Sequence, residues 1–352
     1  MRGRTHIAVT VLIAGSVALS GCAAEQLAAE VPDGTDAATE KCGPLTELTQ
    51  VSVGVNPGAQ DLVTQAMERE EFDKEYNLDV EITSFLNPPA SAQAVTQKAV
   101  EIGFGGVTTM AQARNQGLDV FLFGALASPS NGVFVQKDSD IENIGDLAGK
   151  RVGSFSANNS ATFAVLSAVA SEKFGMEKLE DEVASLVTAP DAALSGLLGQ
   201  GEVDAALFGS TATVVEQLRG EFKKIGDLST EYEEVMGVAP VHLALTTTDS
   251  YAADHCSELV AFSNAMRDAV AHVQADPNAW VEYAETLKLT DPDAPEALQE
   301  VLGTNFRTKW DEAQVEGMTT MLETFIPILG AEDFIPEVPE GLFRSEFVAT
   351  ED

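Results

Sequence analysis

Apolar residues follow two alternating spacings along the chain from Leu48 onward. Valines alternate with small residues over 51–55, which predicts a strand, and apolar residues three and four apart from Leu62 to Met67 predict a helix after it. From Ser250 onward the pattern is almost wholly helical. Because the predicted strands are separated by helices, we expect an α/β fold with mostly parallel sheets flanked by helices and a helical C-terminal part. The further predicted strands are 78–82, 100–105, 120–125, 152–155, 183–187, 205–208 and 238–245.

A weak internal repeat indicates that the chain forms two similar lobes, each with such a sheet. Residues 100–117 can be laid on residues 203–220 without a gap. In both copies a strand ends at glycine, and a threonine-containing turn then opens a helix. The length of 352 residues also exceeds the roughly 250–300 residues at which one hydrophobic core stops growing. The matching pairs are Val100 with Val203, Glu101 with Asp204, Gly106 with Gly209, Thr108 with Thr211, and Gly117 with Gly220.

Two prolines mark where the chain is expected to cross between the lobes. Proline is poorly tolerated in a central strand, so the segments Ser128-Pro129 and Ala239-Pro240 are the predicted crossings. Two crossings make the first lobe discontinuous. We therefore predict that residues 45–128 plus 241–352 form lobe 1 and that residues 129–240 form lobe 2.

The N-terminus has the features of an export signal. Arg2 and Arg4 precede an apolar stretch over 7–19, whose 13 residues are fewer than the roughly 20 that a membrane-spanning helix needs. The segment Leu19-Ser20-Gly21-Cys22 that follows resembles a bacterial lipoprotein signal. We predict a signal peptide over 1–21, an acylated (palmitate-bearing) Cys22, and a flexible tether over 22–44. The alternative is an ordinary secretory signal with an incidental cysteine.

The two other cysteines predict a disulfide. Cys42 and Cys256 form an even pair in an exported chain, and neither has neighbours typical of a metal site. The alternative is two buried, reduced thiols. The four histidines lack metal-ligand spacing, so we expect no metal and no cofactor. We interpret His242, on the second crossing, as a hydrogen-bonded hinge residue and not as a ligand contact.

The charge of the chain excludes some classes of partner. The chain has 56 acidic against 20 basic residues, a formal charge of −36. Sequence-independent binding to nucleic acid or to an anionic membrane surface needs excess lysine and arginine. We therefore expect no nucleic-acid partner and contact with a membrane only through the lipid. The 45% of hydrophobic residues excludes intrinsic disorder as the main state.

Uncharged polar turns follow four of the predicted strands. Ligands of open α/β sheets bind beyond the carboxyl ends of the strands, where helix N-termini offer N–H donors. The alternative is that these residues only cap helices. The turns hold no arginine or lysine, which disfavours a strictly anionic ligand. The predicted ligand contacts are Asn56, Pro57, Gly58, Thr108, Thr109, Ser156, Asn158, Asn159, Ser160, Ser210 and Thr211.

Common enzyme motifs are missing from the sequence. No G-x-S-x-G occurs, and Gly149-Lys150 lacks the spacing of a phosphate-binding loop. Gly103-Phe104-Gly105 begins like a dinucleotide-binding fingerprint, but Thr108 stands where the third glycine belongs. We therefore expect a binding protein and not an enzyme.

The sequence resembles the substrate-binding lipoproteins of ABC importers, in the group for nitrate, sulfonate, taurine and thiamine-pyrimidine precursors. The residues that carry the resemblance are 19–22, 53–57, 100–105, 144–153 and 201–206. The resemblance implies the type II periplasmic binding protein fold, with two lobes around a ligand cleft.

The same resemblance implies a function. A monomer anchored on the outer face of the cytoplasmic membrane would capture a small polar molecule and deliver it to an ABC permease and ATPase complex. Two alternatives stay open. One is an enzyme of the same fold, similar to thiamine-pyrimidine synthases. The other is a structural surface lipoprotein without a ligand cleft.

Overall fold

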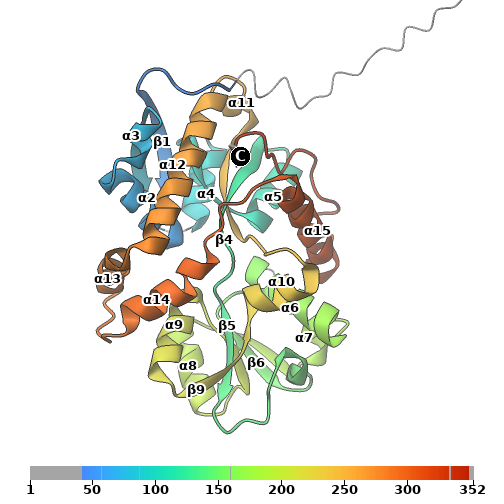
Figure 1. Cartoon of the computed structure of the whole chain (residues 1–352). Helices are drawn as coiled ribbons and strands as arrows, with labels where there is room; N and C mark the ends of the chain where they lie inside the picture. Colours follow the sequence, from blue (N-terminus) through green and yellow to red (C-terminus); the bar gives the residue numbers. More distant parts are fainter. Residues whose placement is uncertain (1–41, 57, 87, 159, 333, 349–352) are drawn as a thin grey trace, which may run out of the picture.

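The computed structural model describes residues 42–56, 58–86, 88–158, 160–332 and 334–348. The predicted signal peptide, Cys22 and nearly all of the predicted tether lie outside these residues. Two five-stranded sheets organise the described chain, one in the upper and one in the lower half of Figure 1. The first sheet has the strand order β2-β1-β3-β10-β4. Its strands are β1 Thr49–Val55, β2 Leu78–Ser84, β3 Ile102–Gly106, β4 Val120–Ala127 and β10 Leu243–Thr248.

The second sheet repeats this arrangement with the order β7-β6-β8-β5-β9. In each order the first three strands are parallel to one another. The fourth strand is antiparallel to both of its neighbours. That strand, β10 or β5, is the first one formed after the chain crosses from the other sheet. The prediction of two mostly parallel sheets is confirmed. The strands of the second sheet are β5 Gly132–Gln136, β6 Arg151–Ser154, β7 Ser185–Thr188, β8 Ala205–Leu207 and β9 Phe222–Asp227.

Helices flank both sheets. The last described part of the chain is mostly helical, as the sequence pattern predicts. The helices are α2 Ala59–Arg69, α3 Phe72–Glu75, α4 Pro88–Thr96, α5 Val107–Asn115, α6 Ala161–Phe174, α7 Leu179–Glu182, α8 Asp191–Gly199, α9 Ser210–Arg219, α10 Leu228–Met236, α11 Asp249–Ala252, α12 Cys256–Ala275, α13 Pro277–Thr286, α14 Ala294–Val301 and α15 Glu312–Leu329, with short 3₁₀ helices at Ile144–Leu147 and Gly303–Asn305.

The sequence repeat corresponds to a structural repeat. The units β3–α5 and β8–α9 occupy the same place in the two sheet orders. Gly106 and Gly209 stand directly before the two helices, at the N-cap position. Gly117 and Gly220 follow the two helices with φ of 88° and 59°, a backbone conformation that glycine adopts without strain. The repeat therefore marks equivalent strand-to-helix junctions.

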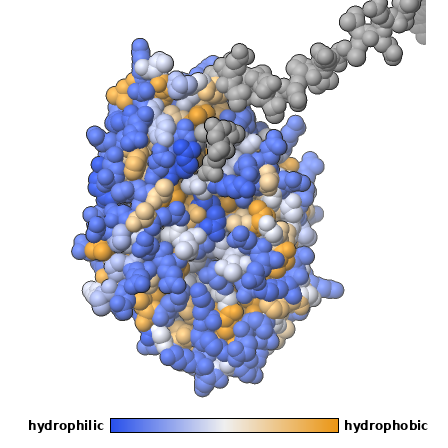
Figure 2. Space-filling view, viewed as in Figure 1, coloured by the Kyte–Doolittle hydropathy of each residue, from blue (hydrophilic) through white to orange (hydrophobic). Residues whose placement is uncertain are grey.

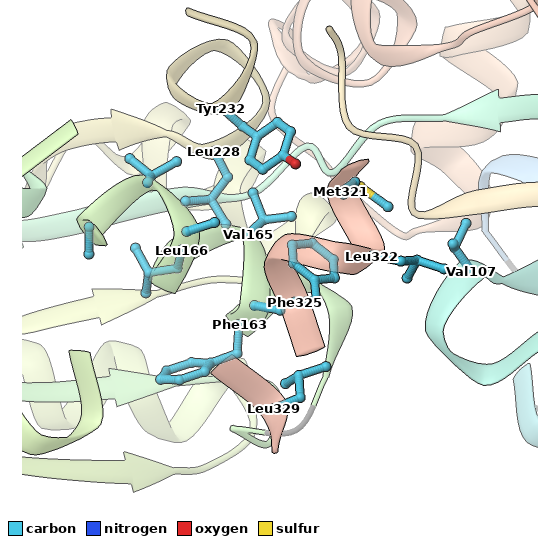
Figure 3. Close-up of a cluster of buried hydrophobic side chains, with 14 of the residues drawn as sticks. Val107, Phe163, Val165, Leu166, Leu228, Tyr232, Met321, Leu322, Phe325 and Leu329 are labelled. Carbon is cyan, nitrogen blue, oxygen red and sulfur yellow. The ribbon is translucent and has the colours of Figure 1, made fainter. Parts of the chain in front are cut away.

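One hydrophobic cluster extends across both lobes. Helix α15 packs on α6 beside the second sheet, and Figure 3 shows Leu322 of α15 pointing toward Val107 of α5. Phe325 points toward α6, and its side chain is fully buried. The C-terminal helix thus contacts elements next to both sheets. The chain passes between the sheets after β4 and again after β9, and the exact lobe boundaries stay a prediction.

A disulfide joins Cys42 to Cys256, the pair that the cysteine count predicts. The two Cα atoms are 5.2 Å apart, and Cys256 is the first residue of α12. The bridge therefore attaches the segment before β1 to the long helix that packs on α2. Among the described residues, no helix combines the length and apolar character needed to cross a membrane.

Candidate ligand cleft

A cavity of about 1150 Å³ lies between the two lobes. Asn56 follows β1 in the first sheet, whereas Phe155 follows β6 in the second, and both line the cavity. Ser128 and His242 lie on the two crossing segments and form part of the wall between the lobes. Strand ends of both sheets therefore face one space, as expected for an α/β ligand site. Hydrophilic residues dominate the outer face shown in Figure 2.

Five of the predicted contacts line this cavity: Asn56, Gly58, Thr109, Ser210 and Thr211. They come from the turns after β1, β3 and β8. The structure thus brings together predicted residues from both lobes, and their role as ligand contacts stays a prediction.

Four other predicted contacts do not belong to the cavity wall. Ser160 caps α6, because its Oγ accepts a hydrogen bond of 3.2 Å from the Phe163 N–H. Asn158 donates to the Glu180 carboxylate at 2.5 Å, away from the cavity. The remaining two are Thr108, which is buried, and Ser156, whose carbonyl accepts from the Ser154 hydroxyl at 2.8 Å. Pro57 and Asn159 lie outside the described residues.

Helix side chains supply the part of the wall that the sequence did not predict. Gln93 and Thr96 belong to α4, Gln112 belongs to α5, and Gln116 directly follows α5. On α5, Thr109, Gln112 and Gln116 are three and four residues apart, a polar stripe that could have been recognised from the sequence. Aromatic rings complete the wall, at Phe104, Phe155, Tyr283 and Phe306.

Several helix N-terminal donors that could have held an anion are already engaged. The Val107 N–H at the start of α5 donates to the His242 carbonyl at 3.1 Å. Before α9, the Gly209 N–H donates to the Asp191 carboxylate at 2.9 Å, and burial raises the pKa of Asp191. Ser160 occupies the Phe163 donor of α6. The capping interpretation therefore applies to these donors.

His242 fixes the second crossing segment and also lines the cavity. Its backbone N–H donates to the Ala127 carbonyl at 3.1 Å, which ties the second crossing to the end of β4. His242 also belongs to the residues that line the cavity, and its buried Nδ1 has no hydrogen-bond partner among the described residues. Burial lowers the pKa of His242 from 6.5 to about 4, against a weaker opposing effect of a hydrogen bond with the Ala127 backbone. The ring is therefore neutral at pH 7.

This buried imidazole should make stability depend on pH. Between pH 6.5 and 4 the unfolded chain binds a proton that folded His242 does not, so stability falls as pH falls through this window. From pH 7 to pH 5 the loss due to His242 is about 2 kcal/mol. In the His242→Gln variant, urea unfolding should show a correspondingly smaller loss between these two pH values. The carboxylates titrate in the parent and in the variant alike, so their contribution to the loss of stability cancels when the two are compared. An equal loss of stability in the parent and the variant would contradict the expectation.

Comparison with solved structures identifies the class to which this fold belongs. The periplasmic aliphatic sulphonate binding protein of Escherichia coli aligns with a TM-score of 0.66 at 17% identity, over 83% of this chain and 90% of that chain. The alkanesulfonate-binding protein of Xanthomonas axonopodis pv. citri, bound to MOPS, aligns with a TM-score of 0.62 at 14% identity. The alignment covers 87% of this chain and 99% of that chain. A Candida albicans protein described as having the generic periplasmic binding protein fold aligns with a TM-score of 0.53 at 14% identity. The alignment covers 79% of this chain and 90% of that chain. The chain therefore has the periplasmic binding protein fold.

Sequence comparison then gives the family. Residues 66–280, more than half of the chain, match the NMT1/THI5-like family. The chain belongs to this family. A Haemophilus influenzae protein named provisionally for thiamine biosynthesis is 28% identical over 233 residues, which cover 65% of this chain and 69% of that protein.

Proposed function

We propose that this protein is an extracytoplasmic solute-binding protein of an ABC importer. The observation that carries the proposal is the cavity between two sheets, into which strand-end turns of both lobes project polar groups. The names of the structurally similar sulfonate-binding proteins support a role in solute capture. The partners would be a small molecule, an ABC permease and its ATPase.

Capture would work by closure of the two lobes around the ligand. Thr109 lies on the wall of the first lobe, and Ser210 and Thr211 lie on that of the second. A ligand that contacts both sets has more interactions when the lobes are closed, so binding shifts the population toward the closed state. The closed form is then the one that a permease would distinguish from the empty protein.

The proposal includes attachment to the membrane through Cys22. The signature Leu19-Ser20-Gly21-Cys22 supports cleavage before this cysteine and acylation of its thiol. The monomeric protein would then lie on the outer face of the cytoplasmic membrane. The mass of the N-terminal peptide of the mature protein tests this point, because an unmodified Cys22 or an intact signal peptide would contradict it.

A variant that blocks the cavity tests solute capture. Thr109 is exposed on the cavity wall, so Thr109→Trp should place a large ring in the space between the lobes and obstruct their closure without disturbing a packed core. We expect the parent to retain a small molecule from a deproteinised extract of its source cells. The variant should bind that molecule about 100-fold more weakly, a loss of about 2.7 kcal/mol. Mass spectrometry of the molecules released after desalting and denaturation gives the retained amount.

Thr320→Trp provides the matched control, because Thr320 is exposed on α15 and does not line the cavity. This variant should retain as much as the parent. Equal retention by the parent and Thr109→Trp would remove the cavity from the binding function. Conversion of the retained molecule during incubation would instead favour the enzyme alternative.

A further inference from the structure

We propose that the ligand of this cavity is an uncharged molecule, an inference that rests on the proposed solute-binding function. None of the described residues that line the cavity is Asp, Glu, Lys or Arg. Charged residues make up 22% of the chain, so several would stand in a wall of this size if they were distributed evenly. The absence of charge is therefore a specific property of this surface.

An uncharged wall selects against charged ligands when the lobes close. A charged group loses its hydration in a closed cleft, and only an opposite charge or several aimed donors or acceptors offset that loss. Amide and hydroxyl groups can replace the hydration of an uncharged polar molecule one hydrogen bond at a time. The wall offers such groups at Gln93, Thr109 and Ser210.

The cationic groups next to the cavity do not change this picture. Arg307 follows the lining residue Phe306, and its Nη1 donates to the carbonyls of Thr304 and Phe306 at 2.7 and 3.0 Å. Burial lowers the pKa of Arg307, and the residue is not part of the wall. His242 lines the cavity, but its imidazole is buried and neutral at pH 7. Neither side chain places a positive charge on the cavity wall.

The second lobe contains a feature that opposes an anion directly. The Asp191 carboxylate accepts the Gly209 N–H at 2.9 Å, immediately before the lining residues Ser210 and Thr211. This carboxylate occupies a donor at the N-terminus of α9 that an anionic group would otherwise use. Its negative charge would also repel a sulfonate or carboxylate brought to this end of the helix.

The aromatic residues narrow the ligand class further. Phe155 of the second lobe and Tyr283 and Phe306 of the helical C-terminal part line the same cavity as the glutamine side chains. Aromatic walls favour flat apolar faces, and amides pair with hydrogen-bonding groups at a ring edge. The lining residues thus suit an uncharged molecule that combines an apolar face with hydrogen-bonding groups.

Ion-exchange fractionation of the cell extract tests the charge of the ligand. A deproteinised extract is passed over a cation exchanger at pH 7 and then over an anion exchanger at pH 11, which also retains zwitterions because their amines are then neutral. The full chain is heated with each fraction after neutralisation. The uncharged flow-through should raise Tm by about 4 °C at ligand concentrations near one hundred times Kd. Ethanesulfonate, a defined anionic probe, should leave Tm unchanged.

The possible outcomes separate the two proposals. A Tm shift caused by the anion or cation fraction and not by the flow-through, or a shift caused by ethanesulfonate, would overturn the uncharged ligand while leaving solute binding intact. No shift with any fraction would contradict solute binding itself and the inference with it.

A pair of glutamine variants adds a measurement on the wall. Gln93 lines the cavity, whereas Gln97, one helical turn later, is exposed and does not line it. Gln93→Glu should lower the affinity for the flow-through ligand at least about tenfold, because closure would bury the new carboxylate. Gln97→Glu should bind like the parent. Equal binding by both variants would show that the wall is not desolvated on closure and would overturn the reason for excluding charge.

Discussion

Replacing Phe325 with alanine is expected to lower the free energy of unfolding by about 3–5 kcal/mol, the usual effect of removing a buried phenylalanine side chain. Phe325 is fully buried in the cluster that α15 forms with α6, and the same helix also contacts α5 of the first lobe. Urea unfolding of the parent and the variant at pH 7 measures the difference.

Two further substitutions on the same helix serve as controls. Phe325→Leu retains most of the apolar volume and should cost about 1.5 kcal/mol or less. Glu323→Ala changes an exposed side chain two residues away and should remain within about 0.5 kcal/mol of the parent. A loss of less than 1.5 kcal/mol in Phe325→Ala would mean that α15 adds little to the stability of the protein.

Removing the disulfide should have an effect of comparable size. The bridge spans a sequence separation of 214, for which the chain-entropy description gives about 5 kcal/mol as an upper value. Residual structure in the unfolded chain lowers this figure, so we expect a loss of about 2–5 kcal/mol in a Cys42→Ser, Cys256→Ser double variant. Urea unfolding under non-reducing conditions measures the loss.

The reduced parent protein is the matched control for the double variant. Unfolding of the parent in excess reductant should give the stability of the double variant, because both lack the same bond. The double variant should itself be insensitive to reductant. Equal stability of the oxidised parent and the double variant would contradict a stabilising role for the bridge.

Much of the fold could be predicted because local patterns and topology agree. The β1 valines alternate over a half-buried strand, and the repeated glycines mark equivalent junctions in both sheets. Strand β10 begins at Leu243, later than the predicted start at residue 238, since Pro240 cannot donate to the hydrogen-bond ladder of a central strand.

Two strands of the second sheet were missed for separate reasons. Strand β9 lies at a sheet edge and contains Lys223 and Lys224, which conceal the apolar alternation. Charged residues at an edge discourage pairing with other chains, so they are compatible with a strand there. Strand β5 has five residues and begins three residues after Pro129, where the pattern predicts a crossing.

The candidate site was only partly predictable. The turns after β1, β3 and β8 follow from the rule that ligands bind at carboxyl ends of strands, and the structure places residues of all three in one cavity. The polar stripe along α5 is visible in the sequence, but the sequence does not assign it or Gln93 of α4 to the site, because the face that a helix turns to the cleft depends on tertiary packing. Ser160 and Asn158 were predicted as ligand contacts but do not line the cavity. Polar residues before a helix also serve as helix caps and as partners of surface side chains.

The position of the disulfide determines how the protein would respond to a mechanical load. Cys42 precedes β1 by seven residues and is bonded to the first residue of α12. A pull on the chain before Cys42 would therefore pass through the sulfur atoms into α12, which packs on α2 and α3. Strand β1, which is hydrogen-bonded to both β2 and β3, would carry none of that force as long as the bond is intact. Reduction would redirect the same pull onto β1 and peel it from its neighbours.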